Sequence, residues 1–324
     1  MFQLRRALRL TVFVSGIFVG IVATLTAYFS RMIISPPRQR LWASPSDLGM
    51  SFEDVQFPAR DGVRLSGWFI PTGESKTGTE AAVDSTAPTL IIIHSWPWNR
   101  LGTAAETVLN DIPGSSPIQL IHLAYSLHRR GYHLLMFDLR NHGQSAPSPP
   151  VTFGLREADD VLGALDFLTR RGDVDQHRIG VVSFAMGANA TIFALPRTDA
   201  LRAVVAVQPT SPAIFSGRYA HSLFGPLGSI VLRLAQLIYL GVGGLRFSAI
   251  EPAFAAAGAG DTPVLYIQGT GDRWGSMDNV KYMVDHTPNA IQPLYVDTKG
   301  CYGGYQYVVE NPEVLNNFFR EQMA

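Results

Sequence analysis

The stretch that most constrains the fold runs from Arg178 to Ala190. Its first half is an apolar run rich in β-branched residues, and its second half changes abruptly to small residues. β-Branched residues favour a strand, whereas small residues directly after a strand let a helix pack close against it. The segment therefore predicts a strand, a sharp turn and a helix in immediate succession.

Length and charge set the class of protein. The chain has 324 residues, 47% of them apolar, with 26 basic and 26 acidic side chains. This composition predicts one sizeable globular domain together with a membrane segment. Without a basic excess, nucleic acid is not an expected partner. The single cysteine, Cys301, excludes an internal disulfide and a cysteine-based zinc cluster, and no other metal or cofactor is expected.

The N-terminus carries the membrane segment. Arg5, Arg6 and Arg9 precede a run from Leu10 to Ser30 that contains no charged residue. About 20 apolar residues in a helix are enough to cross a bilayer. A cleaved signal peptide is the alternative, but its apolar core is usually about 7–15 residues, which is shorter than this run. We predict an uncleaved single-pass anchor over residues 1–34, and arginines on both sides leave its orientation open.

The rest of the chain predicts an α/β domain. A proline-bearing linker over residues 35–50 leads into a globular domain over residues 51–324. Apolar runs that alternate with helical patterns indicate a mostly parallel central sheet flanked by helices. Strands are expected at 52–58, 65–71, 89–94, 132–138, 178–184, 201–207, 263–269 and 291–296, and helices at 118–130, 155–171, 277–285 and 311–320. A surface loop is expected over residues 72–88.

The alternation stops over residues 209–261, where a helical lid is expected. The centre, from Leu223 to Leu240, is almost wholly apolar, with Arg233 as its only charge. Three interpretations remain open: a lid helix over an apolar pocket, a segment that dips into the bilayer surface, or a second span. A Gly-Pro break at Gly225 shortens the clean helix below the roughly 20 residues that a span needs.

Several motifs together resemble the α/β-hydrolase superfamily, specifically its membrane-anchored bacterial members of serine esterase and aminopeptidase type. The turn after the strand, Ser183-Phe-Ala-Met-Gly187, resembles the Gly-x-Ser-x-Gly nucleophile elbow. The segment from Asp138 to Ser145 resembles the family's Asp-x-Arg-Gly-His-Gly-x-Ser loop, and Gly269 to Asp272 resembles its Gly-x-x-Asp loop. The resemblance covers residue 51 to the C-terminus.

The resemblance also implies which residues hold the catalytic positions. Ala185 stands where the serine nucleophile should be, and Ser183, two residues earlier, is the alternative. Asp272 matches the acid of the triad. The histidine position falls on either Cys301 or Gly303, and neither is a base.

Backbone N–H groups that bind the oxyanion in active relatives would belong to Trp96 and Met186. Ser95 replaces a glycine that is usual before the first of these positions. His94 and His142 fall where the family has structural histidines, so neither is expected to be the base. An oxyanion hole without nucleophile and base leaves about 10³–10⁴-fold catalysis over water.

The resemblance therefore predicts a membrane-anchored pseudohydrolase that binds an apolar small molecule or a protein partner. Trp98, Phe184, Leu223 and Leu227 are expected to line this site together with Trp96 and Met186. Two alternatives stay open. The chain is an active esterase or peptidase with a non-standard nucleophile or base, or these side chains pack the pocket shut and leave a scaffold.

Overall fold

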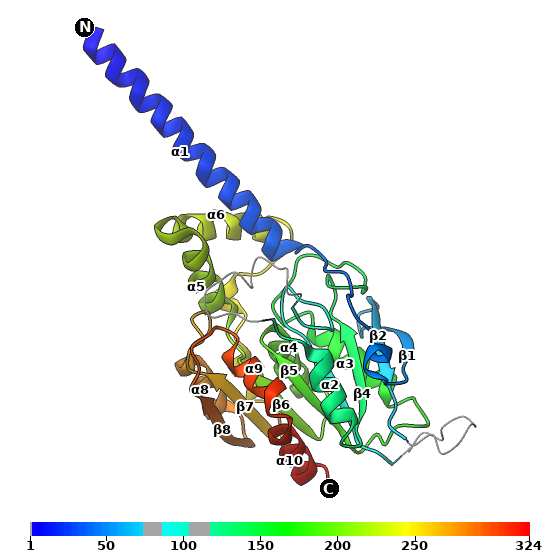
Figure 1. The fold of residues 1–324 in the computed structure, drawn as a ribbon. Coiled ribbons are helices and arrows are strands. Elements are labelled where there is room, and N and C mark those ends of the chain that lie inside the picture. The colour runs from blue at the N-terminus through cyan, green and yellow to red at the C-terminus, as the bar shows by residue number, and fades with distance from the viewer. Residues whose placement is uncertain (1, 74–85, 104–116) are drawn as a thin grey trace.

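The computed structural model describes residues 2–73, 86–103 and 117–324 (Figure 1). The α-helices are α1 (Phe2–Ile34), α2 (Leu120–His128), α3 (Ala158–Leu168), α4 (Met186–Ala194), α5 (Pro212–Phe224), α6 (Gly228–Gly241), α7 (Pro252–Ala256), α8 (Met277–His286), α9 (Gly303–Glu310) and α10 (Pro312–Gln322). The strands are β1 (Glu53–Pro58), β2 (Arg64–Ile70), β3 (Thr89–Ile93), β4 (His133–Asp138), β5 (Ile179–Phe184), β6 (Ala203–Val207), β7 (Val264–Gly269) and β8 (Ala290–Val296).

One sheet organises the domain. Its strand order is β1-β2-β4-β3-β5-β6-β7-β8. The β1–β2 and β2–β4 pairs are antiparallel, and every later pair is parallel. The central strands β3, β4, β5, β6 and β7 are buried along their whole length, as expected for strands covered on both faces.

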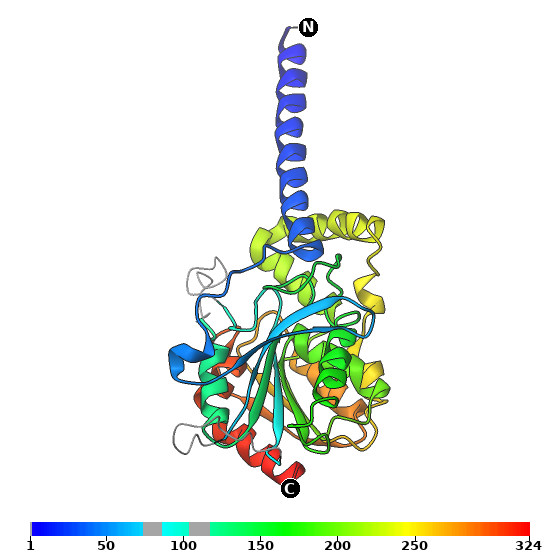
Figure 2. The ribbon, with the colours of Figure 1, turned by 90° about the vertical axis from the view of Figure 1, so that its right-hand side faces the viewer.

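Helices cover both faces of the sheet. Helices α2, α9 and α10 contact one another on one face, and α3, α4, α7 and α8 form a contacting row on the other (Figure 2). The predicted α/β class with a mostly parallel sheet is confirmed, and strand bounds agree to within two residues. Helix α9 was not predicted, because it is short and follows a glycine-bearing turn, whereas α7 falls within the 209–261 region where a helical lid was expected. Most of the expected 72–88 loop lies outside the described residues.

Helix α1 projects from the domain, but its last turns are part of the core. Phe29 and Ile33 are fully buried, and the Phe29 ring packs against Tyr219 and Phe224 of α5 at 6.1 and 5.7 Å. The indole N–H of Trp96 donates to the carbonyl of Met32 at 3.3 Å. Packing therefore continues across the predicted boundary at residue 34.

The region after β6 forms two helices, α5 and α6, which break apart at Gly225. That residue has φ +55°, a backbone conformation open mainly to glycine. The segment Pro212–Gly241 is apolar and long enough to span a bilayer when counted as one. Its two helices have only 13 and 14 residues, about 20 Å each at 1.5 Å per residue, and each is therefore too short to cross alone.

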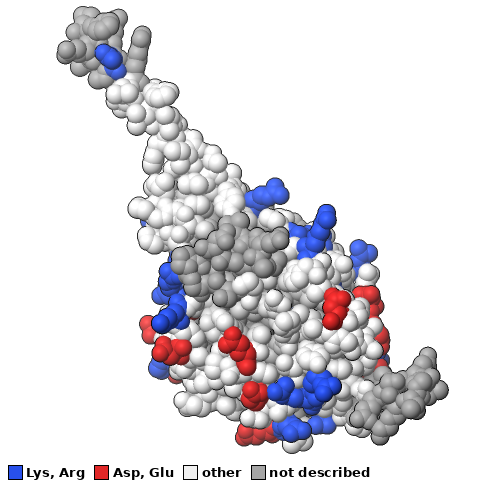
Figure 3. Space-filling model, in the orientation of Figure 1, with Lys and Arg blue, Asp and Glu red and all other residues white. Residues whose placement is uncertain are grey.

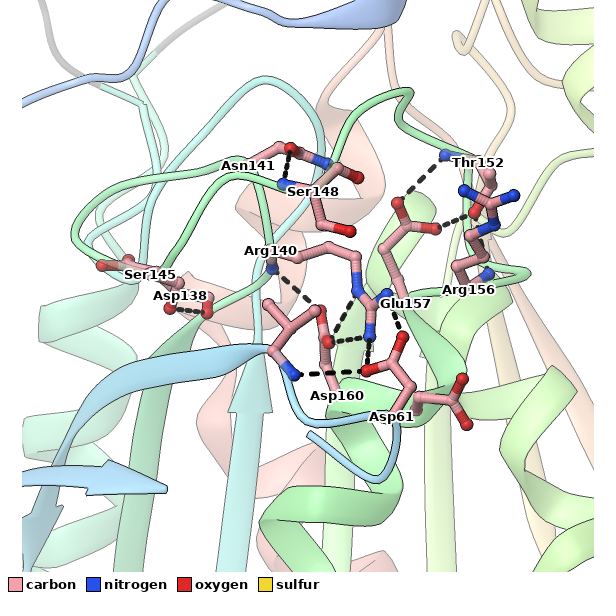
Figure 4. Close-up of polar contacts among 12 residues, drawn as sticks. Asp61, Asp138, Arg140, Asn141, Ser145, Ser148, Thr152, Arg156, Glu157 and Asp160 are labelled. Carbon is pink, nitrogen blue, oxygen red and sulfur yellow. Dashed lines mark hydrogen bonds and ion pairs between the residues drawn. The ribbon is translucent and has the colours of Figure 1, made fainter. Parts of the chain in front are cut away.

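A buried ionic cluster fixes the loops beside the carboxyl ends of the strands (Figure 4). The Arg140 guanidinium lies between Asp61 of the β1–β2 turn and Asp160 of α3, with N···O distances of 2.6–2.8 Å. The Glu157 carboxylate accepts from both the N–H and the hydroxyl of Thr152, at 3.0 and 2.7 Å. The cluster thus joins three elements distant in sequence, and removing Arg140 would leave the buried Asp160 carboxylate without this partner.

Candidate functional site

Ala185 forms the sharp turn between β5 and α4. Its backbone has φ +42° and ψ −104°, which a residue with a side chain rarely adopts and which costs about 1–3 kcal/mol. Its N–H donates to the carbonyl of Val207 in β6 at 2.9 Å, and its carbonyl accepts from the N–H of Asn189 at 2.9 Å. The predicted strand, sharp turn and helix are therefore confirmed.

Close packing places α4 against the loop after β3. A Cβ atom on Gly187 would lie 2.5 Å from the carbonyl oxygen of His94, so only glycine fits at this point. This contact brings the loop that carries Trp96 beside Ala185 and Met186.

A small cavity with many aromatic side chains in its wall lies at this junction. The volume of the cavity that the centres of water molecules can occupy is about 50 Å³. A single water needs about 10–15 Å³ on this measure, so the cavity holds a few waters or one group of similar size. Its aromatic lining is Trp96, Phe153, Phe215, Tyr219, Trp274, Tyr302 and Tyr305, and its other lining residues are Ser95, Ala185, Met186, Asn189, Gln208, Thr210, Pro212, Asp272, Gly275 and Cys301.

Asp272 follows β7 and lines this cavity. Its Oδ1 accepts from the N–H groups of Trp274 and Gly275, both at 2.9 Å. Its Oδ2 accepts from the side-chain amides of Gln208 and Gln268 at 2.8 and 3.3 Å. Burial raises the pKa of Asp272, and these hydrogen bonds act in the opposite direction. Among the described residues, no Lys, Arg or His forms an ion pair with it.

Gln208 occupies the space beside the acid where a catalytic base would have to lie. It directly follows β6 and has φ +49°. Its amide nitrogen donates to Asp272 and to the carbonyl of Cys301 at 2.9 Å, while its amide oxygen accepts from the N–H of Gly304 at 2.7 Å. All eight histidines fall within the described ranges, and none of them lines the cavity.

The two positions considered for the histidine differ in placement. Cys301 is buried and lines the cavity, as does its neighbour Tyr302. Gly303 begins α9 and is not part of the lining. A side chain at Gly303 would meet Thr298, because a Cβ there would lie 2.3 Å from that residue's own Cβ.

His94 and His142 are buried parts of the scaffold. His94 Nε2 accepts from the N–H of Leu139 at 3.0 Å, so its proton lies on Nδ1, which donates to the carbonyl of Ser95 at 2.7 Å. Burial is the largest of the influences that lower the pKa of His94 to about 3. His142 Nδ1 donates to the carbonyl of Arg140 at 2.8 Å. Both imidazoles are thus engaged away from Ala185.

Ser183 does not reach the cavity. Its side chain is fully buried within β5, and its hydroxyl donates to the carbonyl of Val205 in β6 at 3.3 Å. A bound substrate in the cavity would not meet this oxygen.

The structure brings some of the expected site residues together and leaves others apart. Trp96, Ala185, Met186 and Asp272 line the cavity. The remaining four expected residues, Trp98, Phe184, Leu223 and Leu227, do not. The Trp98 and Phe184 rings instead pack against Tyr305 from within the core, and the two leucines lie half-buried near the α5–α6 break.

Sequence reasoning missed Gln208, Tyr219 and Tyr302. Gln208 had one usable indication, since it directly follows a buried parallel strand, and ligands of open α/β sheets meet the carboxyl ends of strands. Nothing in the sequence pattern marks the two tyrosines, because they come from α5 and from the turn before α9.

Comparisons with known proteins agree with this architecture. No protein-family model matches the chain. The uncharacterized protein YfhR of Escherichia coli K12 is 30% identical over 157 residues, which cover 48% of this chain. The match spans less than half of that relative's length, 46%.

Solved structures resemble nearly the whole chain. The esterase Pf2001 of Pyrococcus furiosus superposes with a TM-score of 0.65 at 21% identity, covering 90% of this chain and 99% of its own. The α/β hydrolase GrgF from Penicillium superposes with a TM-score of 0.53 at 18% identity, covering 85% and 99%. The chain therefore has the α/β-hydrolase fold with an apolar N-terminal helix, as the motifs implied.

Proposed function

We propose that this protein is a membrane-anchored pseudohydrolase that binds a small ligand in the cavity beside Ala185 and does not hydrolyse it. One observation carries the proposal. The strained turn that would present a nucleophile carries a methyl group, and the neighbouring acid is held by the amide of Gln208. A methyl group forms no acyl intermediate, and an amide takes no proton from an attacking group at neutral pH.

The size of the cavity limits the size of the ligand that can bind. Pockets for drug-sized molecules measure about 300–1,000 Å³, whereas this cavity offers about 50 Å³ to water centres. A long acyl chain does not fit, although the lining is largely apolar. The proposal is therefore a small ligand with an apolar exterior, and complete closure into a scaffold is the competing state.

An active hydrolase is the second candidate, because Asp272 is present and a structural neighbour is described as an esterase. Such an enzyme would need a nucleophile other than Ala185. The lining holds several hydroxyl groups and one thiol, and we consider Ser95 and Cys301 as the candidates; the Ser95 hydroxyl donates to the carbonyl of Trp96 at 3.2 Å.

Helix α1 supports the membrane anchoring. Leu10–Ile34 is a 25-residue apolar segment, long enough to span a bilayer, and its side chains from Leu10 to Ile21 are exposed. On the face drawn in Figure 3, the described surface of this projecting helix is largely uncharged, with blue near its tip and no red.

Helix α6 extends the membrane contact along the surface. Both ribbon views show it lying across the base of α1, and the two helices are in contact (Figure 2). Ile230, Leu234, Leu237 and Ile238 form an exposed apolar stripe on it, with exposed fractions of 40–65%. Residues 1–46 and 209–250 hold nine arginines and none of the 26 acidic residues. This composition is suited to a helix that lies at the membrane surface near anionic lipid headgroups. In this arrangement α6 is the surface helix and α5 is the lid over the cavity.

Ester hydrolysis tests the loss of catalysis. Full-length protein in detergent is assayed with p-nitrophenyl acetate and butyrate, beside the Ala185→Ser variant. We expect wild-type rates equal to buffer and at most a marginal gain in the variant, because no base lies beside residue 185. Saturable wild-type turnover that survives Ser183→Ala and disappears in Ser95→Ala or Cys301→Ala would establish the active alternative.

A further inference from the structure

Among the residues that the structure describes, the Asp272 carboxylate at the wall of the cavity has no cationic side chain as an ion-pair partner. All four of its hydrogen bonds come from neutral donors, two backbone N–H groups and two side-chain amides. No Lys or Arg of the described ranges is part of the lining. Arg218 hydrogen-bonds the carbonyl of Gly275, a lining residue, but its own side chain does not line the cavity. A poorly solvated charge of this kind is stabilised when a cation binds beside it.

Aromatic rings surround the same space. Trp96, Tyr219, Trp274 and Tyr302 follow one another at centroid distances of 5.5, 5.3 and 5.5 Å, with interplanar angles of 73–88°. All four line the cavity. Aromatic rings attract organic cations through their quadrupoles, by about 0.5–2 kcal/mol for each favourable contact.

The volume restricts the cation to a compact group. A volume of about 50 Å³ for the centres of water molecules holds a few waters. A tetramethylammonium ion has a similar number of heavy atoms. An anion would meet the charge of Asp272 unfavourably, and a neutral apolar ligand would leave that charge without a partner.

We infer that the ligand of this cavity is a small organic cation, a quaternary ammonium or a methylated amine, held between Asp272 and the rings of Trp96, Tyr219, Trp274 and Tyr302. The inference rests on the proposed non-hydrolytic binding at this cavity, and it names the class of ligand. The aromatic rings supply the apolar contact, and the carboxylate supplies the charge.

Binding of matched probes tests this inference. Full-length protein in detergent is titrated calorimetrically with tetramethylammonium chloride, choline chloride and 3,3-dimethyl-1-butanol, the neutral isostere of choline, with sodium chloride as the ionic-strength control. We expect saturable binding of both cations and at least tenfold weaker binding of the isostere. Equal affinity for choline and its isostere, or no binding of either cation, would overturn the inference.

Variants place the binding in the cavity. Trp274→Leu removes one ring and leaves Asp272 intact, and Tyr125→Leu removes an exposed tyrosine of α2 outside the cavity as a matched control. We expect at least fivefold weaker choline binding in the first variant and no change in the second. Asp272→Asn should abolish the preference for choline over its isostere.

Circular dichroism first establishes that each variant is folded. If Trp274→Leu and Tyr125→Leu bind choline equally, the cation binds elsewhere and the inference fails. Failure of the proposed function would be seen separately, as ester turnover by the wild-type protein.

Discussion

Ala185 lies in a strained turn between a strand and a helix, and its side chain is a methyl group. The positive φ angle is sterically unfavourable for alanine, yet Gly187 and the hydrogen bond from Ala185 to Val207 hold the turn in place. Geometry at this position is therefore determined by the packing of α4 against two strands. On the proposed function, an alanine at this position removes the chemistry of the turn and leaves its shape intact.

His94 predicts a pH dependence of stability. Its pKa is lowered to about 3, against 6.5 in an unfolded chain, so only the unfolded state takes up a proton as the pH falls below 6.5. The stabilisation is present above pH 6.5 and is lost toward acid, by about 1.4 kcal/mol per pH unit. Carboxylates and His142 also titrate, so the contribution of His94 must be isolated by a variant.

The comparison uses His94→Gln, which keeps an acceptor for the Leu139 N–H and does not titrate. We expect wild type to be the more stable protein at pH 7.5, and its advantage to shrink by about 2 kcal/mol at pH 5. Urea unfolding at both pH values measures the difference. A constant difference would show that His94 is protonated in the folded state.

At the scale of elements, helices α5 and α6 have different surroundings. Helix α5 contributes Phe215 and Tyr219 to the cavity, whereas α6 exposes the stripe from Ile230 to Ile238 beside α1. The sequence predicted the apolar character of this segment but left its role open. The break at Gly225 decides the path of the chain, because the two helices then face different surroundings.

Contact of α6 with lipid predicts a depth difference between labelled sites. Single cysteines at Leu234 and Met277, which are 40% and 41% exposed, are labelled with an environment-sensitive fluorophore in full-length protein in nanodiscs. We expect spin-labelled lipids to quench the label at Leu234→Cys and to spare the label at Met277→Cys on α8. A third label at Ile17→Cys in α1 reports the anchor.

Wild-type protein, whose only cysteine is buried, gives the background labelling. Quenching at residue 17 without quenching at residue 234 would support α1 as the membrane anchor and would contradict the proposed contact of α6 with lipid. Protection of residue 234 without quenching, in particles that contain two chains, would assign the stripe to a second copy of the protein.

At the scale of the whole molecule, the last turns of α1 and the domain are one packed unit. Phe29 and Ile33 lie in the core, Trp96 donates to the carbonyl of Met32, and Arg38 donates to the carbonyl of Gly143 at 2.9 Å. The last turns of α1 thus contact α5 and the loop after β3, both of which line the cavity. A change in the position of the anchor would be transmitted directly to the cavity wall.

Two truncations should therefore differ. Removal of residues 1–20 takes away only the projecting part of α1, whereas removal of residues 1–34 also deletes two fully buried side chains. Loss of such side chains costs about 2–5 kcal/mol each, against a total stability of about 5–15 kcal/mol. We expect the shorter truncation to keep the wild-type melting temperature and the longer one to melt at least 10 °C lower. Equal melting by circular dichroism would place the domain boundary at residue 34 after all.

Four features could be predicted from the sequence, because each depends on a local pattern. They are the class of fold, the positions of the strands along the chain, the sharp turn at Ala185 and the loop that carries Asp272. The sequence did not allow the cavity to be predicted. Gln208, Tyr219 and Tyr302 come from separate elements, and tertiary packing alone brings them together. The expected contacts of Trp98 and Phe184 did not form at the cavity, since strand and loop geometry directs both rings into the core.

The central claim, that this hydrolase fold has lost its nucleophile, is tested most directly by a covalent probe. Intact-protein mass spectrometry after incubation with a fluorophosphonate measures whether any side chain is phosphonylated, with a serine esterase as the positive control. We predict an unchanged mass for the wild-type protein, because Ala185 has no hydroxyl and Ser183 is buried. A stoichiometric adduct on Ser183, on Ser95 or on any other residue that lines the cavity with Ser95 would contradict this account.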